Sequence, residues 1–308
     1  MSTATVPVAG RAAAPAEPIK PKKRRVRPMR MVLHVFLMIV ALGWLAPLLL
    51  AVYASLRPYG ETAKHGYFSL PRNLSLDYYS RAWTEGGMLK YFLNSMIIAV
   101  PGVLVTLFLA SLVAFVVSRL RIRLGAAILI LFTAGNLMPP QAIIIPVYEA
   151  FRHIPLPAAM SDSLTLYDSY WGLVIIHIAF QTGFCVFVLA NYMRTIPHEI
   201  TEAAVVDGAG VWLQYWRITM PLTRPALAAL GTLLFTWIYN DFLFGLVLIS
   251  TGDKLPVTTA LNNLRGEFFV DYNLLAAGSV LVALPTIIVF LVLQKQFIAG
   301  LTLGSNKG

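Results

Sequence analysis

The 308-residue chain is strongly apolar and sparsely charged: 58% of its residues are hydrophobic, 12% are charged, and its mean hydropathy is +0.72. This composition is typical of a helical protein that crosses a membrane several times, and it excludes an ordinary soluble domain. The net charge of +10 would also suit a nucleic-acid-binding protein. The basic run KPKKRRVRPMR, however, directly precedes the first apolar stretch and contains no aromatic residue. We interpret it as a topology anchor drawn to anionic lipid, and expect no nucleic-acid partner.

Six apolar stretches are long enough to cross a hydrocarbon layer of about 30 Å, which takes about 20 helical residues. The first exceeds a signal-peptide apolar region of about 7 to 15 residues and lacks a small-residue cleavage pattern, so we expect it to be retained. The sequence therefore predicts an all-α polytopic membrane protein with six transmembrane helices. The six predicted spans are residues 31–53, 91–118, 124–148, 170–193, 225–250 and 272–294.

Lysine and arginine are unevenly distributed between the segments that connect these spans. If the N-terminus is cytoplasmic, 16 of the 24 lie in cytoplasmic segments and eight in the longer outer loops. Because positive charge is enriched on the cytoplasmic side, we expect both termini to be cytoplasmic. The chain then divides into a disordered basic arm, a first span with its outer loop, a core of the remaining spans, and a cytoplasmic tail. These parts are residues 1–30, 31–90, 91–297 and 298–308.

The most distinctive cytoplasmic segment is residues 197–225, PHEITEAAVVDGAGVWLQYWRITMPLTRP. Pro197 and the acidic residues of the next turn predict the start of a helix, and Gly208 predicts its stop, since glycine can adopt positive φ. A second helix, with Trp212, Tyr215 and other large residues on one face, is expected to end at Pro221. From the residues alone, the segment is either a surface shaped for a partner or an amphipathic loop resting on lipid headgroups.

Three motifs resemble a known family. EAAVVDGAGVWLQYWRITMP resembles the EAA loop of the membrane subunits of binding-protein-dependent ATP-binding cassette importers, with Glu-Ala-Ala, Asp-Gly-Ala and Ile-x-x-Pro in order. WIYNDFLFGLVLI in the fifth span resembles the Trp-Asn-Asp-Phe stretch of carbohydrate importers, with Tyr239 inserted as a departure. GLTLGSNKG at the C-terminus resembles the tail of the maltose permease G-type subunit. The resemblance covers roughly residues 30–308 and implies a MetI-like permease fold.

The resemblance implies a permease subunit of an ATP-driven sugar importer, with an oligosaccharide as the expected substrate. The implied partners are a second permease subunit that shares the translocation pathway, two cytoplasmic ATPase subunits, an extracytoplasmic sugar-binding protein and the lipid of a bacterial plasma membrane. The chain has no Gly-x-x-x-x-Gly-Lys-Ser/Thr phosphate loop, so ATP hydrolysis is expected on a separate subunit, and we expect no cofactor. The implied ATPase-coupling residues are Glu202, Ala203, Ala204, Asp207, Gly208 and Pro221.

Asp241 is the only acidic residue in the predicted spans. A carboxylate at that depth costs about 2.5 to 3.5 kcal/mol, so it should face the bundle interior or a water-filled path, beside Asn240. A role in the translocation pathway and a structural hydrogen bond between helices are both open. His177 and Gln181, one turn apart in the fourth span, are candidates for the same path or for packing.

The outer loop at residues 251–271 matches in position the loop that, in the maltose permease G-type subunit, probes the sugar-binding protein. By this resemblance the loop docks a binding protein, and the alternative is a solvated connector. The implied docking residues are Asn262, Asn263, Arg265 and Glu267.

Two alternative functions belong to other classes of protein. His198-Glu199-x-x-Glu202 is one residue away from the His-Glu-x-x-His motif of zinc proteases, but the second histidine is absent. An ion-coupled secondary transporter would be expected to have paired acids in its spans or an internal repeat, and it leaves the EAA pattern unexplained.

Overall fold

The computed structural model of the protein describes residues 28–120, 124–265 and 270–302, which are mainly helical and form no strand. The long helices are α1 (Pro28–Ser55), α4 (Met88–Arg119), α7 (Tyr170–Arg194), α10 (Met220–Tyr239) and α13 (Tyr272–Thr302). The shorter α-helices are α2 (Tyr59–His65), α3 (Asp77–Thr84), α5 (Gly125–Gly135), α6 (Pro140–His153), α8 (His198–Val206), α9 (Val211–Leu213), α11 (Leu243–Leu248) and α12 (Val257–Ala260). A π-helical turn, η1, spans Gln214–Thr219, and two 3₁₀ turns, η2 and η3, span Gly252–Lys254 and Leu261–Leu264.

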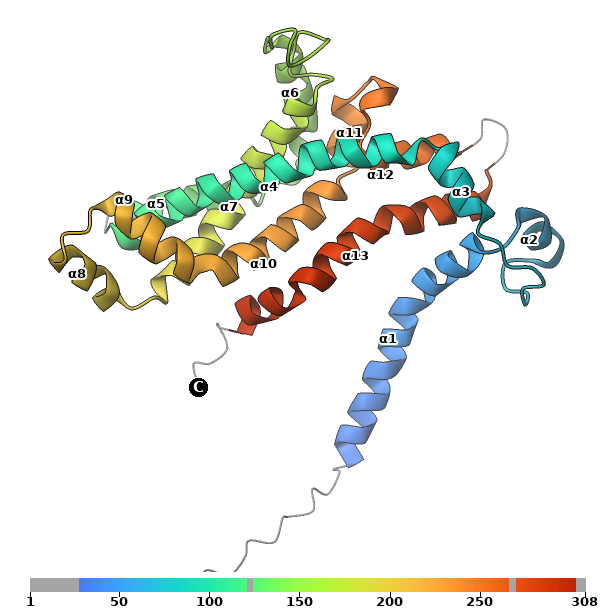
Figure 1. Cartoon of the computed structure of the whole chain (residues 1–308), viewed down its shortest axis with the longest axis horizontal. Helices are drawn as coiled ribbons and strands as arrows, with labels where there is room; N and C mark the ends of the chain where they lie inside the picture. The colour runs from blue at the N-terminus through green and yellow to red at the C-terminus, as the bar shows by residue number, and fades with distance from the viewer. Residues whose placement is uncertain (1–27, 121–123, 266–269, 303–308) are drawn as a thin grey trace, which may run out of the picture. The chain divides into compact units, whose positions relative to one another are not determined.

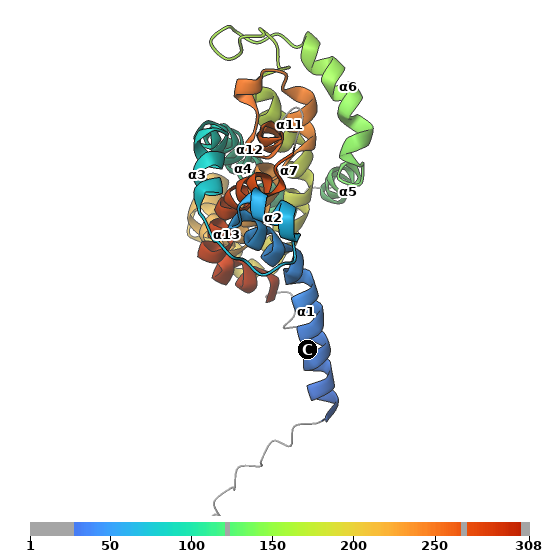
Figure 2. The same cartoon turned by 90° about the vertical axis from the view of Figure 1, so that its right-hand side faces the viewer.

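The chain divides inside α1 into two compact units, Met1–Leu48 and Leu49–Gly308. In the first, the described residues form most of α1. In the second, α4 contacts α7 and α10, and α10 contacts α13, so that these four helices form a bundle (Figures 1 and 2). Small buried residues at these contacts allow the helix backbones to come close in a membrane. They include Ala110, Ala114, Ala190 and Ala226.

The two ends of this bundle carry different elements. Figure 1 shows α8 and α9 at one end, and α3 and α12 toward the other. Residues 197–225 and the loop that follows α11 are therefore at opposite ends of the bundle. This arrangement is the one that the predicted topology requires of a cytoplasmic loop and an outer loop.

Among the residues that the structure describes, five helices are long and apolar enough to cross a membrane: Met29–Ser55, Met88–Arg119, Tyr170–Arg194, Val211–Tyr239 and Tyr272–Lys295. The remaining predicted span, residues 124–148, is not one straight helix. It consists of α5 and α6, which are bent by 91°. Pro139 has an extended backbone and Pro140 begins α6. A proline lacks an N–H and disfavours helical geometry in the residue before it, so two prolines in succession break the span.

The observed fifth span, Val211–Tyr239, lies closer to the N-terminus than the predicted span, residues 225–250. Pro221 does not end a helix. The Met220 N–H donates to the Tyr215 carbonyl five residues earlier, and the chain continues through Pro221 into α10. The wider π-helical turn accommodates a proline, which has no N–H of its own. The span ends at Tyr239, and Asn240, Asp241 and Phe242 separate it from α11.

Candidate functional site

The EAA loop (residues 197–225) begins with α8, a well-defined helix with a glycine stop. Pro197 is extended, with φ −53° and ψ 137°, and Glu199 lies in the first turn, where the helix dipole favours a carboxylate. Asp207 follows the last residue of the helix, and Gly208 has φ 77°, the left-handed conformation that the sequence predicted. The Gly208 N–H donates to the Val205 carbonyl over 3.0 Å, which closes the final turn.

One face of α8 is open. Glu202 and Ala203 are exposed, whereas Ala204 is buried within the chain. Val205 and Val206, at the end of the helix, are 60% and 86% exposed. Adjacent exposed apolar side chains beside a carboxylate are more typical of a surface that meets a partner than of one that faces water.

The second half of the EAA loop is fixed to α4. Tyr215 is buried, its hydroxyl lies 2.7 Å from Ser111 Oγ, and its ring packs on Phe115 with centroids 5.4 Å apart. Trp216 stacks on Phe108, also from α4. The predicted aromatic face of the second helix therefore packs partly against α4, and α8 is joined to the bundle through it.

Arg119, at the end of α4, also reaches the EAA loop. Its Nη2 donates to the Ile196 carbonyl over 3.0 Å, one residue before Pro197. The side chain is buried, and its Nε and Nη1 have no hydrogen-bond partner among the described residues. Sequence reasoning counted Arg119 only as a topology charge, because nothing in the sequence links it to Ile196.

Asn240 and Asp241 lie in the break between α10 and α11. An Asp241 oxygen accepts the Gly245 N–H over 3.1 Å, which stabilises the start of α11, and His177 Nε2 lies 3.8 Å from Asp241 Oδ2. Asn240 is exposed and donates to Thr286 Oγ1 on α13 over 3.1 Å. Asn240 therefore bonds between two helices, whereas the Asp241 carboxylate accepts from the start of its own α11 and has His177 of α7 within 3.8 Å. A role for either residue in the translocation pathway stays a prediction.

A polar network that the sequence did not reveal ties the outer segments together. Asp168, just before α7, accepts the N–H groups of Ser250 and Thr251 over 2.9 Å each, and the Thr251 hydroxyl over 2.6 Å. Lys254 Nζ lies 3.6 Å from Asp168 Oδ2. Burial would raise the pKa of Asp168, but these hydrogen bonds and the Lys254 ammonium outweigh burial and lower the pKa of the carboxyl.

The same outer loop is held on α4. Asn94 Nδ2 donates to the carbonyls of Asp253 and Leu255 over 2.9 and 3.0 Å, and Asn94 Oδ1 accepts from the Tyr170 hydroxyl over 2.8 Å. Ser95 Oγ accepts the Val257 N–H over 2.9 Å. These contacts fix residues 250–257 on α4 and α7, although their members are far apart in the sequence.

Three predicted docking residues lie on this anchored loop. Asn262 and Asn263 belong to η3 and Arg265 follows it, and all three are exposed. Asn263 Nδ2 donates to the Tyr91 hydroxyl over 3.2 Å. Glu267 lies outside the described residues.

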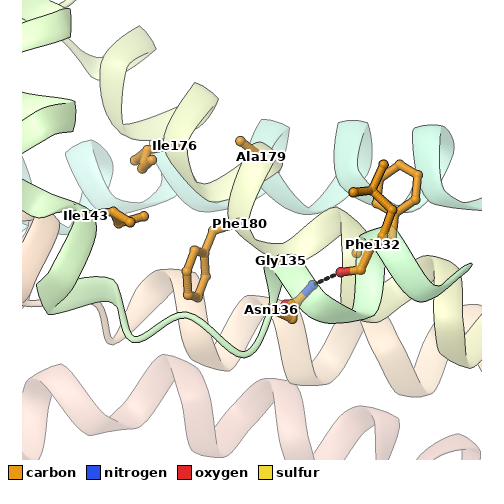
Figure 3. Close-up of a pocket in the computed structure, with 9 residues that line it drawn as sticks. Phe132, Gly135, Asn136, Ile143, Ile176, Ala179 and Phe180 are labelled. Atoms are coloured by element: carbon orange, nitrogen blue, oxygen red, sulfur yellow. Dashed lines mark hydrogen bonds between the residues drawn. The ribbon is translucent and has the colours of Figure 1, made fainter. Parts of the chain in front are cut away.

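Two cavities flank the break between α5 and α6. The smaller, shown in Figure 3, has a volume of about 270 Å³, and the larger about 560 Å³; Asn136 and Phe180 line both. The Asn136 side chain donates to the Phe132 carbonyl over 3.1 Å (Figure 3). Gly183 on α7 allows α5 to approach, because a Cβ there would lie 2.5 Å from the Phe132 oxygen.

The residues that the structure describes contain no cluster of side chains suited to a metal ion. None of their histidine, cysteine, aspartate and glutamate side chains forms a group of three able to hold a metal ion, and this includes His198, Glu199 and Glu202 at the start of α8.

These features define a class of protein: an integral membrane protein with a broken span, an exposed helix–glycine–helix segment at one end and an anchored polar loop at the other. Residues 102–302 match the family model described as "binding-protein-dependent transport system inner membrane component". The chain belongs to this family, and the resemblance drawn from the EAA loop is confirmed.

Relatives and a solved structure agree with this assignment. The chain is 30% identical to a probable ABC transporter permease protein of Pyrococcus horikoshii, over 85% of this chain and 92% of that protein. It is 29% identical to the melibiose/raffinose/stachyose import permease protein MelC of Bacillus subtilis, over 92% of this chain and 99% of that protein. A chain of a bacterial ABC transporter involved in the import of the acidic polysaccharide alginate shares the fold, with a TM-score of 0.75 and 24% identity, over 89% of this chain and 98% of that chain.

Proposed function

We propose that the chain is the membrane-spanning permease subunit of an ATP-driven, binding-protein-dependent importer of an oligosaccharide, in the plasma membrane of a bacterium. The family supports import with a binding protein, and the sugars in the name of the relative MelC support a saccharide substrate. The observation that carries the coupling part of the proposal is the open face of α8 at one end of the bundle. The secondary-transporter and zinc-protease alternatives leave both the family and this face unexplained.

In the proposed mechanism, α8 docks on a separate ATPase subunit. Glu202 makes the polar contact and Ala203, which is exposed, permits close approach. Ala204 packs inward, and Asp207 with Gly208 turns the chain back toward the bundle. Movement of α8 then reaches the spans by two routes.

The first route is the Tyr215 contact with α4, and the second is the hydrogen bond between Arg119 and the Ile196 carbonyl. Pro221, in the first turn of α10, lies at the junction that carries this movement. Two ATPase subunits, one beneath each permease subunit, supply the energy in this proposal.

The remaining parts of the chain receive roles in the same scheme. A second permease subunit completes the translocation pathway, which Asn240 and Asp241 border. The basic arm of residues 1–30 anchors the topology with both termini in the cytoplasm, residues 31–90 supply the first span and outer loop, and residues 298–308 reach toward the ATPase. Residues 91–297 form the permease core.

A binding protein docks on the outer loop in this scheme, through Asn262, Asn263, Arg265 and Glu267. The loop is suited to this because Asn94, Ser95 and Asp168 hold its base rigidly. Deletion of residues 260–267 is expected to abolish sugar uptake that depends on the binding protein. Uptake that survives the deletion would count against docking.

The coupling proposal is tested by two substitutions in α8 and its turn. Glu202→Lys reverses the charge on the open face, and Gly208→Pro removes the positive φ, so each should abolish ATP-dependent sugar uptake while the protein remains in the membrane. Glu199→Lys, the same charge reversal in the first turn of α8, is the matched control and should retain more uptake. Normal uptake by both test variants would refute the coupling role.

A further inference from the structure

The loop between α2 and α3 exposes large apolar side chains (Figure 1). Phe68 and Leu70 are 84% and 87% exposed, and three more large apolar residues in the same ten-residue stretch are exposed by 41% or more. Exposed apolar side chains gathered in this way generally mark a surface that meets a partner or a membrane. The five residues are Tyr67, Phe68, Leu70, Leu74 and Leu76.

A buried arginine holds this loop in place. Arg57 is only 1% exposed, and its Nη1 donates to the carbonyls of Gly66 and Tyr67 over 3.2 and 3.1 Å. Its Nη2 donates to Ser69 Oγ over 2.7 Å and to Glu61 Oε1 over 3.2 Å. The apolar side chains of the loop therefore cannot turn inward without breaking buried hydrogen bonds, which is costly.

Two spans define the level of the membrane surface beside this loop. The apolar helix of α1 ends at Ser55, and that of α13 begins at Tyr272. Asn273 Nδ2 donates to the Ala54 carbonyl over 3.0 Å, so the two span ends lie side by side. The hydrocarbon of the membrane therefore ends near the last turn of α1.

The loop returns to this level. The hydroxyl of Tyr53, in the last turn of α1, donates to the Ser69 carbonyl. The Ser75 N–H donates to the carbonyl of Leu56, the residue that follows α1, over 2.8 Å. The sequence neighbours of Ser69 are the two most exposed apolar residues of the loop, so both lie where the hydrocarbon gives way to lipid headgroups.

Basic side chains flank the apolar ones. Lys64 and Arg72 are exposed and form no ion pair with any residue that the structure describes. The Glu61 carboxylate fixes the second of them by accepting the Arg72 N–H over 2.8 Å. Apolar side chains beside cations are typical of segments that lie in the membrane interface. A surface for a transient protein partner would instead leave Phe68 and Leu70 in water whenever that partner is absent.

We propose that residues 67–76 are a leaflet anchor, a segment that enters the outer leaflet of the membrane. Phe68 and Leu70 insert among the acyl chains, and Lys64 and Arg72 bind lipid phosphates. Through Arg57 the anchor holds the outer end of α1 at a fixed depth. The proposal rests on the proposed topology, but not on the transported substrate or on coupling to an ATPase.

The test measures the depth of the loop in the complete importer, reconstituted in lipid vesicles without a binding protein. Cys185, the only cysteine, is buried and is replaced by alanine. A nitroxide is then attached to Phe68→Cys or Leu70→Cys. Its collisions with oxygen, which concentrates in hydrocarbon, are compared with its collisions with a neutral nickel chelate, which stays in water. Asn262→Cys, exposed on η3, is the control.

At Phe68→Cys and Leu70→Cys, collisions with oxygen should exceed those with the chelate, and at Asn262→Cys the order should be reversed. More collisions with the chelate than with oxygen at both loop positions would show that the loop lies in water, and would overturn the anchor. Few collisions with either reagent would show that protein covers the loop, which would overturn the anchor as well.

The role of the two cations is tested by changing the lipid. Replacing part of the phosphatidylcholine with phosphatidylglycerol should raise the ratio of oxygen to chelate collisions at Leu70→Cys, because each basic side chain favours an anionic surface about fivefold. The rise should disappear when Lys64→Gln and Arg72→Gln are combined. A ratio that does not respond to phosphatidylglycerol, or that responds equally without the two cations, would overturn their binding to phosphates.

The proposed topology is checked by a separate measurement. In right-side-out membrane vesicles, Asn262→Cys should react with a membrane-impermeant maleimide added outside. If it reacts and the loop nitroxides meet only water, the leaflet anchor is wrong and the topology stands. If Asn262→Cys is not reached from outside, the topology fails, and the anchor in the outer leaflet fails with it.

Discussion

Replacing Gly183 with alanine should separate α5 from α7 and destabilise the chain. An added Cβ would lie 2.1 Å from Asn136 Nδ2 and 2.5 Å from the Phe132 carbonyl oxygen. The amide could rotate away, but the carbonyl belongs to the backbone of α5, so the helix itself must move. Overpacking of this kind costs about 1 to 3 kcal/mol, against which the higher helix propensity of alanine returns about 0.5 to 1 kcal/mol. We expect a net loss of up to about 2.5 kcal/mol.

Gly231→Ala on α10 is the matched control for this substitution. Its Cβ would meet only Leu107 Cδ1 at 3.5 Å, an ordinary contact, so the propensity gain should remain. The assay is thermal unfolding of the purified full chain in detergent, followed by loss of the monodisperse species. Gly183→Ala should melt below the wild-type chain, and Gly231→Ala at or above it. A Gly183→Ala variant that melts with the control would refute the close packing of α5 on α7.

Three further substitutions test other contacts. Asp168→Asn should lower the melting temperature at neutral pH. The difference in melting temperature between the variant and the wild type should narrow as the pH falls below about 4, through the lowered folded-state pKa of Asp168, because only the ionised carboxylate stabilises the fold. Melting curves between pH 7 and 3 check this. Asn273→Leu should cost about 1 to 3 kcal/mol, measured by melting, because the fully buried amide donates to the carbonyls of Ala54 and Arg57. Tyr215→Phe should cost about 1 kcal/mol and reduce uptake, since it removes the hydrogen bond to Ser111 between the EAA loop and α4; uptake equal to wild type would exclude that contact as a route of coupling.

The positions of the membrane-crossing segments were largely predictable because length and hydropathy decide them. Five of the six predicted stretches overlap long apolar helices. The third was predicted as one span, and the structure divides it into α5 and α6, bent by 91° where Pro139 and Pro140 lie. Prolines are tolerated in membrane helices, so their presence in the sequence did not by itself predict this break. Pro221 was predicted to end a helix, and that prediction was wrong. The π-helical turn before it lets the chain continue through Pro221 into α10.

The candidate site was predictable only where it is local in sequence. The turn at Gly208 could be anticipated, because glycine tolerates positive φ and the helix pattern stops there. The partners of Asp168 and Asn94 lie about 80 and 160 residues away, and no periodicity reveals such pairs.

In the proposed mechanism, α8 is the surface through which this permease meets its ATPase. The most direct test is a photo-crosslinking amino acid placed at Val206, which is 86% exposed on α8, with the same group at Ile175 of α7 as control. In membranes that contain the complete importer, we expect a crosslink from position 206 to an ATP-binding cassette subunit and none from position 175. Crosslinks from position 206 to lipid alone, in an importer that transports normally, would contradict it.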